Sequence, residues 1–161
     1  MATAGSPTAR DKAVLWSVIA MLGYFIVDNH VDLYPWNDLD RVGSQLASTL
    51  SGVIPFTLAA LTFRLGWRWA MVFFAGYAWV WLGIQVWNWW VPYLFGGERT
   101  FLPEYERTLH PLPPIDGRPG PNAEHLVLQL LSLVMALTMT MATVRAFRPG
   151  AGRGGSRSTD R

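Results

Sequence analysis

The chain has 161 residues, enough for one domain, and its formal net charge is +2. Only 15% of its residues are charged, against about 25% in soluble globular proteins, while 51% are hydrophobic and nine are tryptophan. This composition argues against a water-soluble domain, and the absence of cysteine excludes disulfides, thiolate metal sites and thiol redox chemistry.

Four long apolar segments account for this composition. A transmembrane helix needs about 20 mainly apolar residues to cross a hydrocarbon core of about 30 Å. Segments of this kind, with few charges inside them, lie at about residues 12–32, 43–63, 69–90 and 125–145. The sequence therefore predicts an all-α fold, an integral membrane four-helix bundle, in a single domain of residues 1–147.

The first span contains a carboxylate. Its apolar part, Ala13–Val27, is 15 residues long, or about 22 Å at the helical rise, which is too short to cross. The helix must continue to about Asp32, which places Asp28 one turn below the outer membrane boundary, with Tyr24 and Asp32 on the same face. Because a carboxylate is costly there, Asp28 is a functional-site hypothesis. A cleaved signal peptide is the alternative, but no small-residue cleavage site follows, so we expect the segment to be retained.

The outer ends of the other spans carry polar and aromatic side chains as well. Counting about 20 residues from Trp69 places Gln85 one turn below the outer boundary and Asn88 at the boundary. Polar stripes at helical spacing also start at the outer ends of the second and fourth spans. We expect one outward-facing polar pocket, lined by Tyr24, Asp28, Asp32, Gln45, Gln85, Asn88, Trp89, His125 and Gln129.

The connection between the third and fourth spans, residues 98–124, contains six prolines and cannot form one long helix. A long loop without secondary structure is usually either functional or disordered. The apolar side chains of this loop argue for packing, so we expect an ordered Pro-rich cap over the outer face. The tail of residues 148–161 is rich in Gly, Ser and Arg and is predicted to be disordered.

Charged residues divide between the two sides of the predicted membrane. One side holds the N-terminal segment, the connection between the second and third spans and the tail, with nine basic and two acidic residues. The other side holds the remaining two connections with their span ends, with four basic and nine acidic residues. By the positive-inside rule both termini are cytoplasmic. Twelve of the 13 basic residues are arginine, which is typical of GC-rich bacterial genomes. We therefore expect a multi-pass protein of the bacterial inner membrane.

Two stretches, "WWVPYLFG" (89–96) and "LPPIDGRPGPNAEH" (112–125), resemble a pairing found in small, uncharacterised bacterial integral membrane proteins with four predicted spans. In these proteins an aromatic-Pro-Tyr exit from the third helix is followed by a Leu-Pro-Pro loop, and a histidine opens the fourth helix. The resemblance covers about residues 85–129 and implies the same topology. That family has no assigned activity, so the resemblance implies no catalytic role for any residue.

The sequence leaves several functions open. The leading hypothesis is a non-enzymatic membrane component, either an accessory subunit or a small-ligand binder that uses the outward-facing pocket. One alternative is a membrane enzyme acting on a lipid-like or small apolar substrate, with Asp28 and His125 as an acid/base pair. Another is a small oligomeric transporter. The amides also have a simpler interpretation, as packing contacts between helices worth about 0.6 kcal/mol each.

Few cofactors and partners fit the sequence. The candidate metal ligands are His30, His110, His125 and Glu124, but no pair has a compact ligand spacing, so we expect no metal and no other cofactor. The basic residues adjoin the membrane or lie in the tail, which argues against nucleic acid as a partner. The expected partners are membrane lipid and either another protein or a second copy of the chain.

Overall fold

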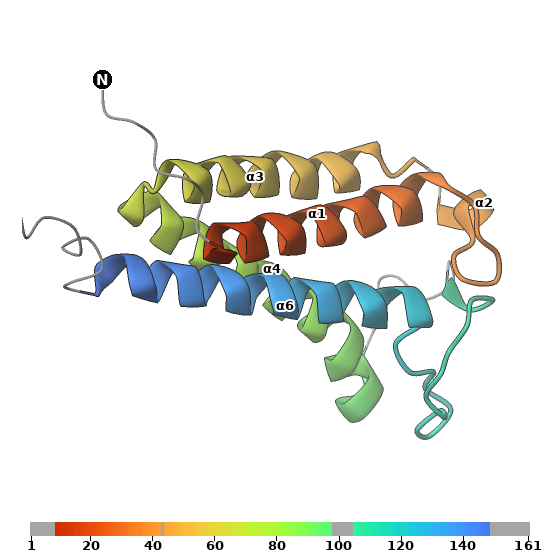
Figure 1. The fold of residues 1–161 in the computed structure, drawn as a ribbon. Coiled ribbons are helices and arrows are strands. Elements are labelled where there is room, and N and C mark those ends of the chain that lie inside the picture. The colour runs from red at the N-terminus through yellow and green to blue at the C-terminus, as the bar shows by residue number, and fades with distance from the viewer. Residues whose placement is uncertain (1–8, 43, 98–104, 149–161) are drawn as a thin grey trace, which may run out of the picture.

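The computed structural model describes residues 9–42, 44–97 and 105–148, and of residues 9–11 only the backbone. The helices are, in chain order, α1 (Ala9–His30), α2 (Leu39–Val42), α3 (Leu46–Leu65), α4 (Arg68–Phe95) and α6 (Ala123–Phe147) (Figure 1). About 75% of the structure is helical, and the described residues contain no strand, only one isolated bridge between Ile115 and Arg118. The predicted all-α fold is confirmed.

The four long helices form one bundle. α1 packs against α3 and α6, and α4 packs against the same two helices, so the main contacts form a closed ring. Figure 1 shows the first turn of α1 and the last turn of α6 at one end of the bundle, which we call the terminus end. The loops that follow α1 and precede α6 lie at the other end, which we call the loop end. The last turns of α4 lean away from α1 and α3 and run beside the loop that precedes α6.

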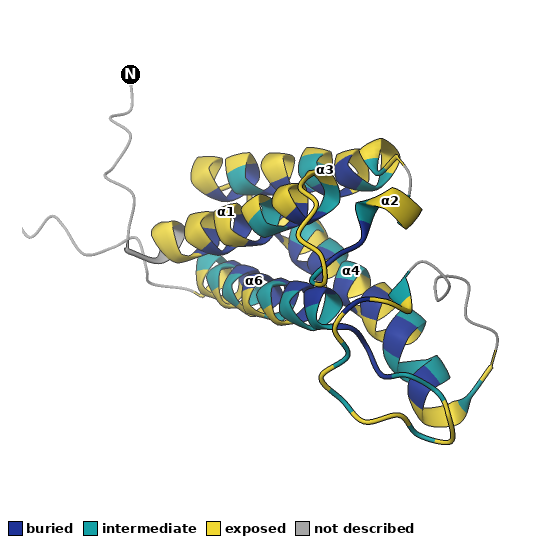
Figure 2. Ribbon diagram, turned by 90° about the vertical axis from the view of Figure 1, so that its right-hand side faces the viewer, coloured by how far each residue is buried: buried dark blue, intermediate teal, exposed yellow. Residues whose placement is uncertain are grey.

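All four long helices are long and apolar enough to cross a membrane. The outward faces of the helices are exposed (Figure 2). Many of the exposed side chains are large and apolar, among them Trp69 and Phe95, which are 80% and 79% exposed. Lipid tails are as apolar as these side chains, so the exposure suits a hydrocarbon surrounding. The chain is a multi-pass membrane protein with the predicted four-helix bundle.

The centre of the bundle is apolar and closely packed. The ring of Phe56 is fully buried and meets the Trp81 ring edge-on, with centroids 5.6 Å apart. Small residues let the helices approach one another, as is usual between membrane helices. The fully buried ones are Ala59, Ala78 and Ala136, and three fully buried methionines, Met21, Met135 and Met139, fill the remaining space.

The long helices begin and end within about five residues of the predicted spans, and two of the differences bear on the loop end. α1 ends at His30 and not at residue 32, because the following loop turns back and satisfies its last carbonyls, as described below. α4 continues past residue 90, through Pro92, to Phe95. Proline removes one hydrogen bond of the helix, but the Gly96 N–H still bonds the Pro92 carbonyl at 3.0 Å. Gly96 then ends the helix with a φ of 79°, a conformation that favours glycine.

The described part of the cap loop, residues 105–122, lies across the loop end. The Leu109 N–H donates to the Pro35 carbonyl (3.0 Å), and the Ala123 N–H donates to the Leu109 carbonyl (2.7 Å). These bonds tie the loop to the segment after α1 and to the start of α6, so this part of the predicted cap is ordered. The structure does not describe residues 98–104 of the loop. It also does not describe residues 149–161, so the predicted disorder of the tail lies outside the described residues.

The packing of α1 against α3 gives a first prediction. A Cβ added at Gly52 would lie 2.8 Å from Cε1 of the buried Phe25. We expect Gly52→Ala to lower the free energy of unfolding by about 1–3 kcal/mol, measured by denaturant unfolding in detergent micelles. Gly76→Ala in α4 is the matched control, because a Cβ there meets nothing within 4 Å. It should leave stability unchanged or raise it by up to about 1 kcal/mol. Equal effects of the two variants on stability would contradict close packing of Gly52 against Phe25.

Candidate functional site

A buried asparagine closes the loop end of α1. The Asn37 side chain donates from Nδ2 to the carbonyls of Asp28 (2.7 Å) and Val31 (2.9 Å), and its Oδ1 accepts from the Leu33 N–H (2.7 Å). The last carbonyls of a helix have no partner within the helix. Asn37 is 2% exposed, so it supplies these partners where water is scarce and holds the following loop against the bundle.

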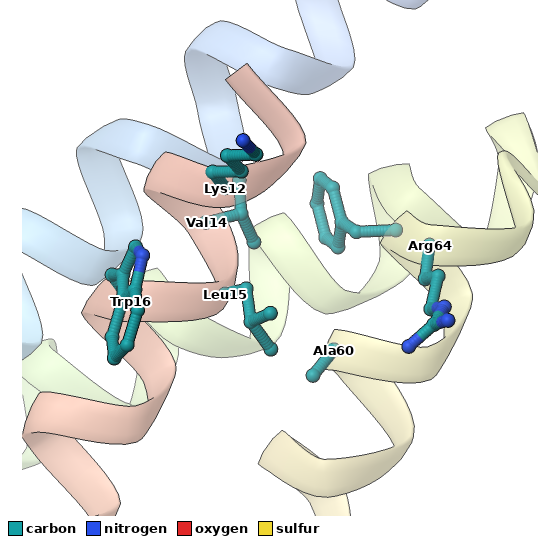
Figure 3. Close-up of a pocket in the computed structure, with 7 residues that line it drawn as sticks. Lys12, Val14, Leu15, Trp16, Ala60 and Arg64 are labelled. Carbon is teal, nitrogen blue, oxygen red and sulfur yellow. The ribbon is translucent and has the colours of Figure 1, made fainter. Parts of the chain in front are cut away.

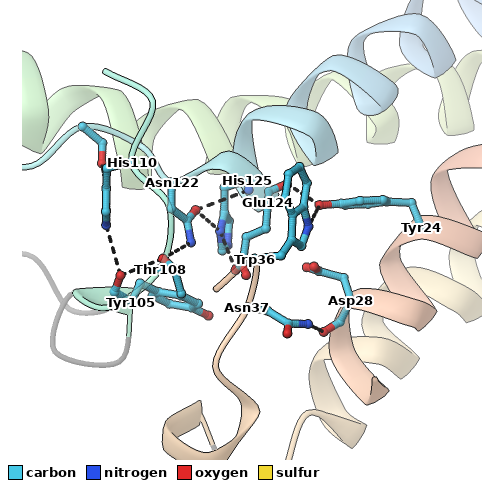
Figure 4. Close-up of polar contacts among 11 residues, drawn as sticks. Tyr24, Asp28, Trp36, Asn37, Tyr105, Thr108, His110, Asn122, Glu124 and His125 are labelled. Atoms are coloured by element: carbon cyan, nitrogen blue, oxygen red, sulfur yellow. Dashed lines mark hydrogen bonds and ion pairs between the residues drawn. The ribbon is translucent and has the colours of Figure 1, made fainter. Parts of the chain in front are cut away.

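A second buried asparagine starts α6. Asn122 is the N-cap residue, and its Oδ1 accepts from the backbone N–H of His125 (3.3 Å). Its Nδ2 donates to the Thr108 hydroxyl (3.1 Å), which donates to the Tyr105 carbonyl (2.7 Å). Asn122 therefore satisfies an N–H of the first helical turn and ties the cap loop to α6 (Figure 4).

A chain of hydrogen bonds joins α1 to α6. The Tyr24 hydroxyl donates to the Glu124 carbonyl (2.8 Å), and Trp36 Nε1 donates to the Tyr24 oxygen (3.0 Å). Trp36 belongs to the loop after α1, so three segments meet at Tyr24 (Figure 4). These bonds fix the register of α1 against α6 and bring Glu124 to the level of Asp28.

Two buried carboxylates line one small cleft at this meeting point. Asp28 of α1 is 7% exposed and Glu124 of α6 is 3% exposed. Asp28 Oδ1 and Glu124 Oε2 have no hydrogen-bond partner among the described residues. An unpartnered buried polar atom is costly, so a ligand that bonds these two oxygens would remove that cost. The cleft has a volume of about 10 Å³, room for about one water molecule, and its other lining residues are Asn29, Asn37, Leu39, Val42, Gln45 and Tyr105.

The His125 ring packs in a cluster with two aromatic rings that also contact each other, and it lies next to Glu124. Its centroid lies 4.2 Å from that of Trp89 and 5.1 Å from that of Tyr105. His125 Nδ1 lies 2.7 Å from Asn122 Oδ1 and 2.9 Å from Glu124 Oε1. Both oxygens are acceptors, so Nδ1 carries a proton and donates to them. The acidic group that His125 contacts is Glu124, not Asp28, with which the sequence pairs it.

Two other residues predicted for the pocket, Gln85 and Gln129, lie at the interface between α4 and α6, and a third, Asn88, belongs to α4. Gln85 Nε2 donates to the Ser132 hydroxyl (3.1 Å), and Trp90 Nε1 donates to Gln129 Oε1 (2.8 Å). Asn88 is half-buried and forms no side-chain hydrogen bond with the described residues. These amides do not line the cleft, and their bonds are of the kind that joins membrane helices.

The remaining predicted pocket residues divide between the cleft and the surface. Gln45, just before α3, lines the cleft and donates from Nε2 to the Val42 carbonyl (3.2 Å). Tyr24 lies beside the cleft, bonded as described above. Asp32 is exposed, since α1 ends at His30 and Asp32 lies beyond it.

The candidate metal ligands are dispersed. His30 Nε2 lies 3.0 Å from the Thr49 hydroxyl on the α3 side of the loop end. His110 is held between the carbonyls of Gly120 (2.7 Å from Nδ1) and Tyr105 (3.0 Å from Nε2). Within the described parts of the chain, no group of three or more His, Cys, Asp or Glu side chains is arranged to hold a metal ion.

Sequence reasoning missed the residues that hold the site together. Asn122 stands directly before the fourth apolar segment, and asparagine is a preferred N-cap residue, so a signal for it was present. Asn37 and Trp36 act through a loop that folds back on α1, and no periodicity in the sequence indicates this. Glu124 was considered only as a metal ligand, whereas the structure places it opposite Asp28 in the cleft.

No protein-family model, curated protein or solved structure matches the chain. The function of the cleft therefore has to be inferred from its own geometry.

The hydrogen bonds of Asn122 give a second prediction. Asn122→Ala removes the N-cap acceptor and leaves the Thr108 hydroxyl without its donor, so we expect the free energy of unfolding to fall by about 1–3 kcal/mol. Amide hydrogen exchange should accelerate in the first turn of α6 and in residues 105–110. Asn88→Ala removes the same side chain from a position without a hydrogen bond and should change stability by less than about half as much. An equal loss in both variants would show that Asn122 does not hold the cap loop.

Proposed function

We propose that this protein is a non-enzymatic component of the bacterial inner membrane that binds one small monovalent cation, a proton or Na⁺, between Asp28 and Glu124. The observation that carries the proposal is the pair of buried carboxylates, each with an oxygen that lacks a partner, on one cleft of about 10 Å³. The charge asymmetry of the loops supports an orientation in which this cleft faces outward.

The charges around the cleft favour a cation. An ionised carboxylate removed from water is strongly destabilised unless it is paired or takes up a proton. No lysine or arginine among the described residues forms an ion pair with Asp28 or Glu124, and the histidine beside Glu124 supplies at most one positive charge. One further positive charge between the two carboxylates would balance negative charge that the protein leaves unpaired.

The size and the chemistry of the cleft restrict the ligand. A volume that suits one water molecule admits a proton, with or without water, or Na⁺, and excludes a lipid or a metabolite. The other polar groups of the lining are amides and a phenol, whose oxygens suit hard cations rather than transition metals. The small number of carboxylates favours a monovalent over a divalent ion.

The geometry gives less support to the enzyme alternative with Asp28 and His125 as acid and base. His125 Nδ1 already contacts Asn122 and Glu124, and its ring is packed against those of Trp89 and Tyr105. These contacts suit a side chain that orients Glu124. Cation binding needs no reaction step, and it suits an accessory subunit or a small-ligand binder.

The test compares the neutral variants Asp28→Asn and Asp32→Asn. The second is the matched control, because Asp32 is exposed and lies just beyond the end of the same helix. Thermal unfolding in detergent is followed as Na⁺ replaces choline at constant ionic strength, and separately as the pH is lowered. A ligand that binds only the folded state stabilises it by about 2.7 kcal/mol at about 100-fold excess over Kd.

For wild type we expect stability to rise with Na⁺ if the ligand is Na⁺. If the ligand is a proton, stability should rise as pH falls, because the folded state then binds more protons than the unfolded state. Asp28→Asn should lose the dependence, and Asp32→Asn should keep it. The proposal fails if wild type responds to neither cation, or if Asp28→Asn responds as wild type does.

A further inference from the structure

A groove at the terminus end of the bundle has no role in the cation site. It lies between the first turns of α1 and the last turns of α3 and has a volume of about 370 Å³, within the range of about 300–1,000 Å³ that is usual for ligand sites. Val14 and Phe63 form its floor and belong to the buried core, at 1% and 4% exposed. The floor is therefore rigid, and the groove is open on the side that faces lipid.

The walls of the groove combine apolar side chains with two positive charges. Leu15 of α1 points toward Ala60 of α3, and the Trp16 ring lies on the side of α1 away from Ala60 (Figure 3). Lys12 of α1 and Arg64 of α3 also line the groove. Neither Lys12 nor Arg64 forms an ion pair with any side chain that the structure describes. The groove is thus apolar along its length and positively charged at the membrane boundary.

Trp16 places the groove at the level of the lipid headgroups. Its side chain is 65% exposed, and it lies one helical turn from Lys12. Tryptophan gathers at the interface between hydrocarbon and headgroups, and lysine reaches from there toward water. The basic rim therefore lies where phosphate groups of lipids are found, and the apolar part lies where acyl chains begin.

We propose that this groove binds one anionic phospholipid of the leaflet at the terminus end, with its phosphate between Lys12 and Arg64 and an acyl chain along Leu15, Ala60 and Phe63. The complementarity of charge selects an anionic lipid over a zwitterionic one. It also selects lipid over a second copy of the chain, because two copies facing each other through this groove would bring like charges together.

The test uses the full-length protein in vesicles of equal parts phosphatidylglycerol and phosphatidylcholine. After mild detergent extraction, native mass spectrometry counts the lipids that each protein molecule retains. Wild type should retain phosphatidylglycerol in preference to phosphatidylcholine. In the double variant Lys12→Gln/Arg64→Gln the preference should fall by about 30-fold, because each basic contact near an anionic surface is worth about 1 kcal/mol.

The matched control is Arg68→Gln/Arg145→Gln. It removes two positive charges from the same end of the bundle, at positions that do not line the groove, and should keep most of the preference. A second variant, Ala60→Leu, fills the groove without changing its charge and should reduce retention of both lipids. The proposal is overturned if wild type shows no preference, or if the two double variants lose it equally. It is also overturned if Ala60→Leu retains lipid as wild type does.

Discussion

Peptide groups at the end of a membrane helix need hydrogen-bond partners at a depth where water is scarce, and this constraint shapes the loop end of the bundle. Asn37 donates hydrogen bonds to carbonyls at the end of α1, and Asn122 accepts one from an N–H at the start of α6. Each asparagine belongs to a connecting segment and not to the body of a helix, so both loops must cross the end of the bundle to bring them there. The cap and the cleft below it are consequences of this arrangement.

The position of the carboxylates follows from the same bonds. Asn122 fixes where α6 begins, and Glu124 follows two residues later, in the first turn. The bond from Tyr24 to the Glu124 carbonyl then sets the register against α1, so that Glu124 and Asp28 share one cleft. Two like charges would not be brought together by packing alone, since burial of each one is unfavourable. The proposed cation would offset the cost of burying both.

The sequence predicts the fold better than it predicts the site, for a physical reason. The thickness of the hydrocarbon core sets the length of each span, so apolar runs reveal the helices directly. A polar stripe shows which face of a helix is polar but not the angle at which that helix crosses its neighbours. Gln85, for example, donates to Ser132 of α6 and does not line the cleft. Asp32 is exposed because Asn37 allows α1 to end earlier, and this long-range contact leaves no local pattern.

The cleft and the groove lie far apart along α1. Asp28 and Lys12 are 16 residues apart on α1, or about 24 Å at the helical rise, with the apolar core between them. Effects at sites more than about 7–10 Å apart without shared partners usually add. The cleft is lined by both loops as well as by helix ends, so its occupancy is linked to the folding of the cap. The groove rests on α1 and α3 alone, so we expect the proposed lipid to stabilise the bundle without changing cation binding at the cleft.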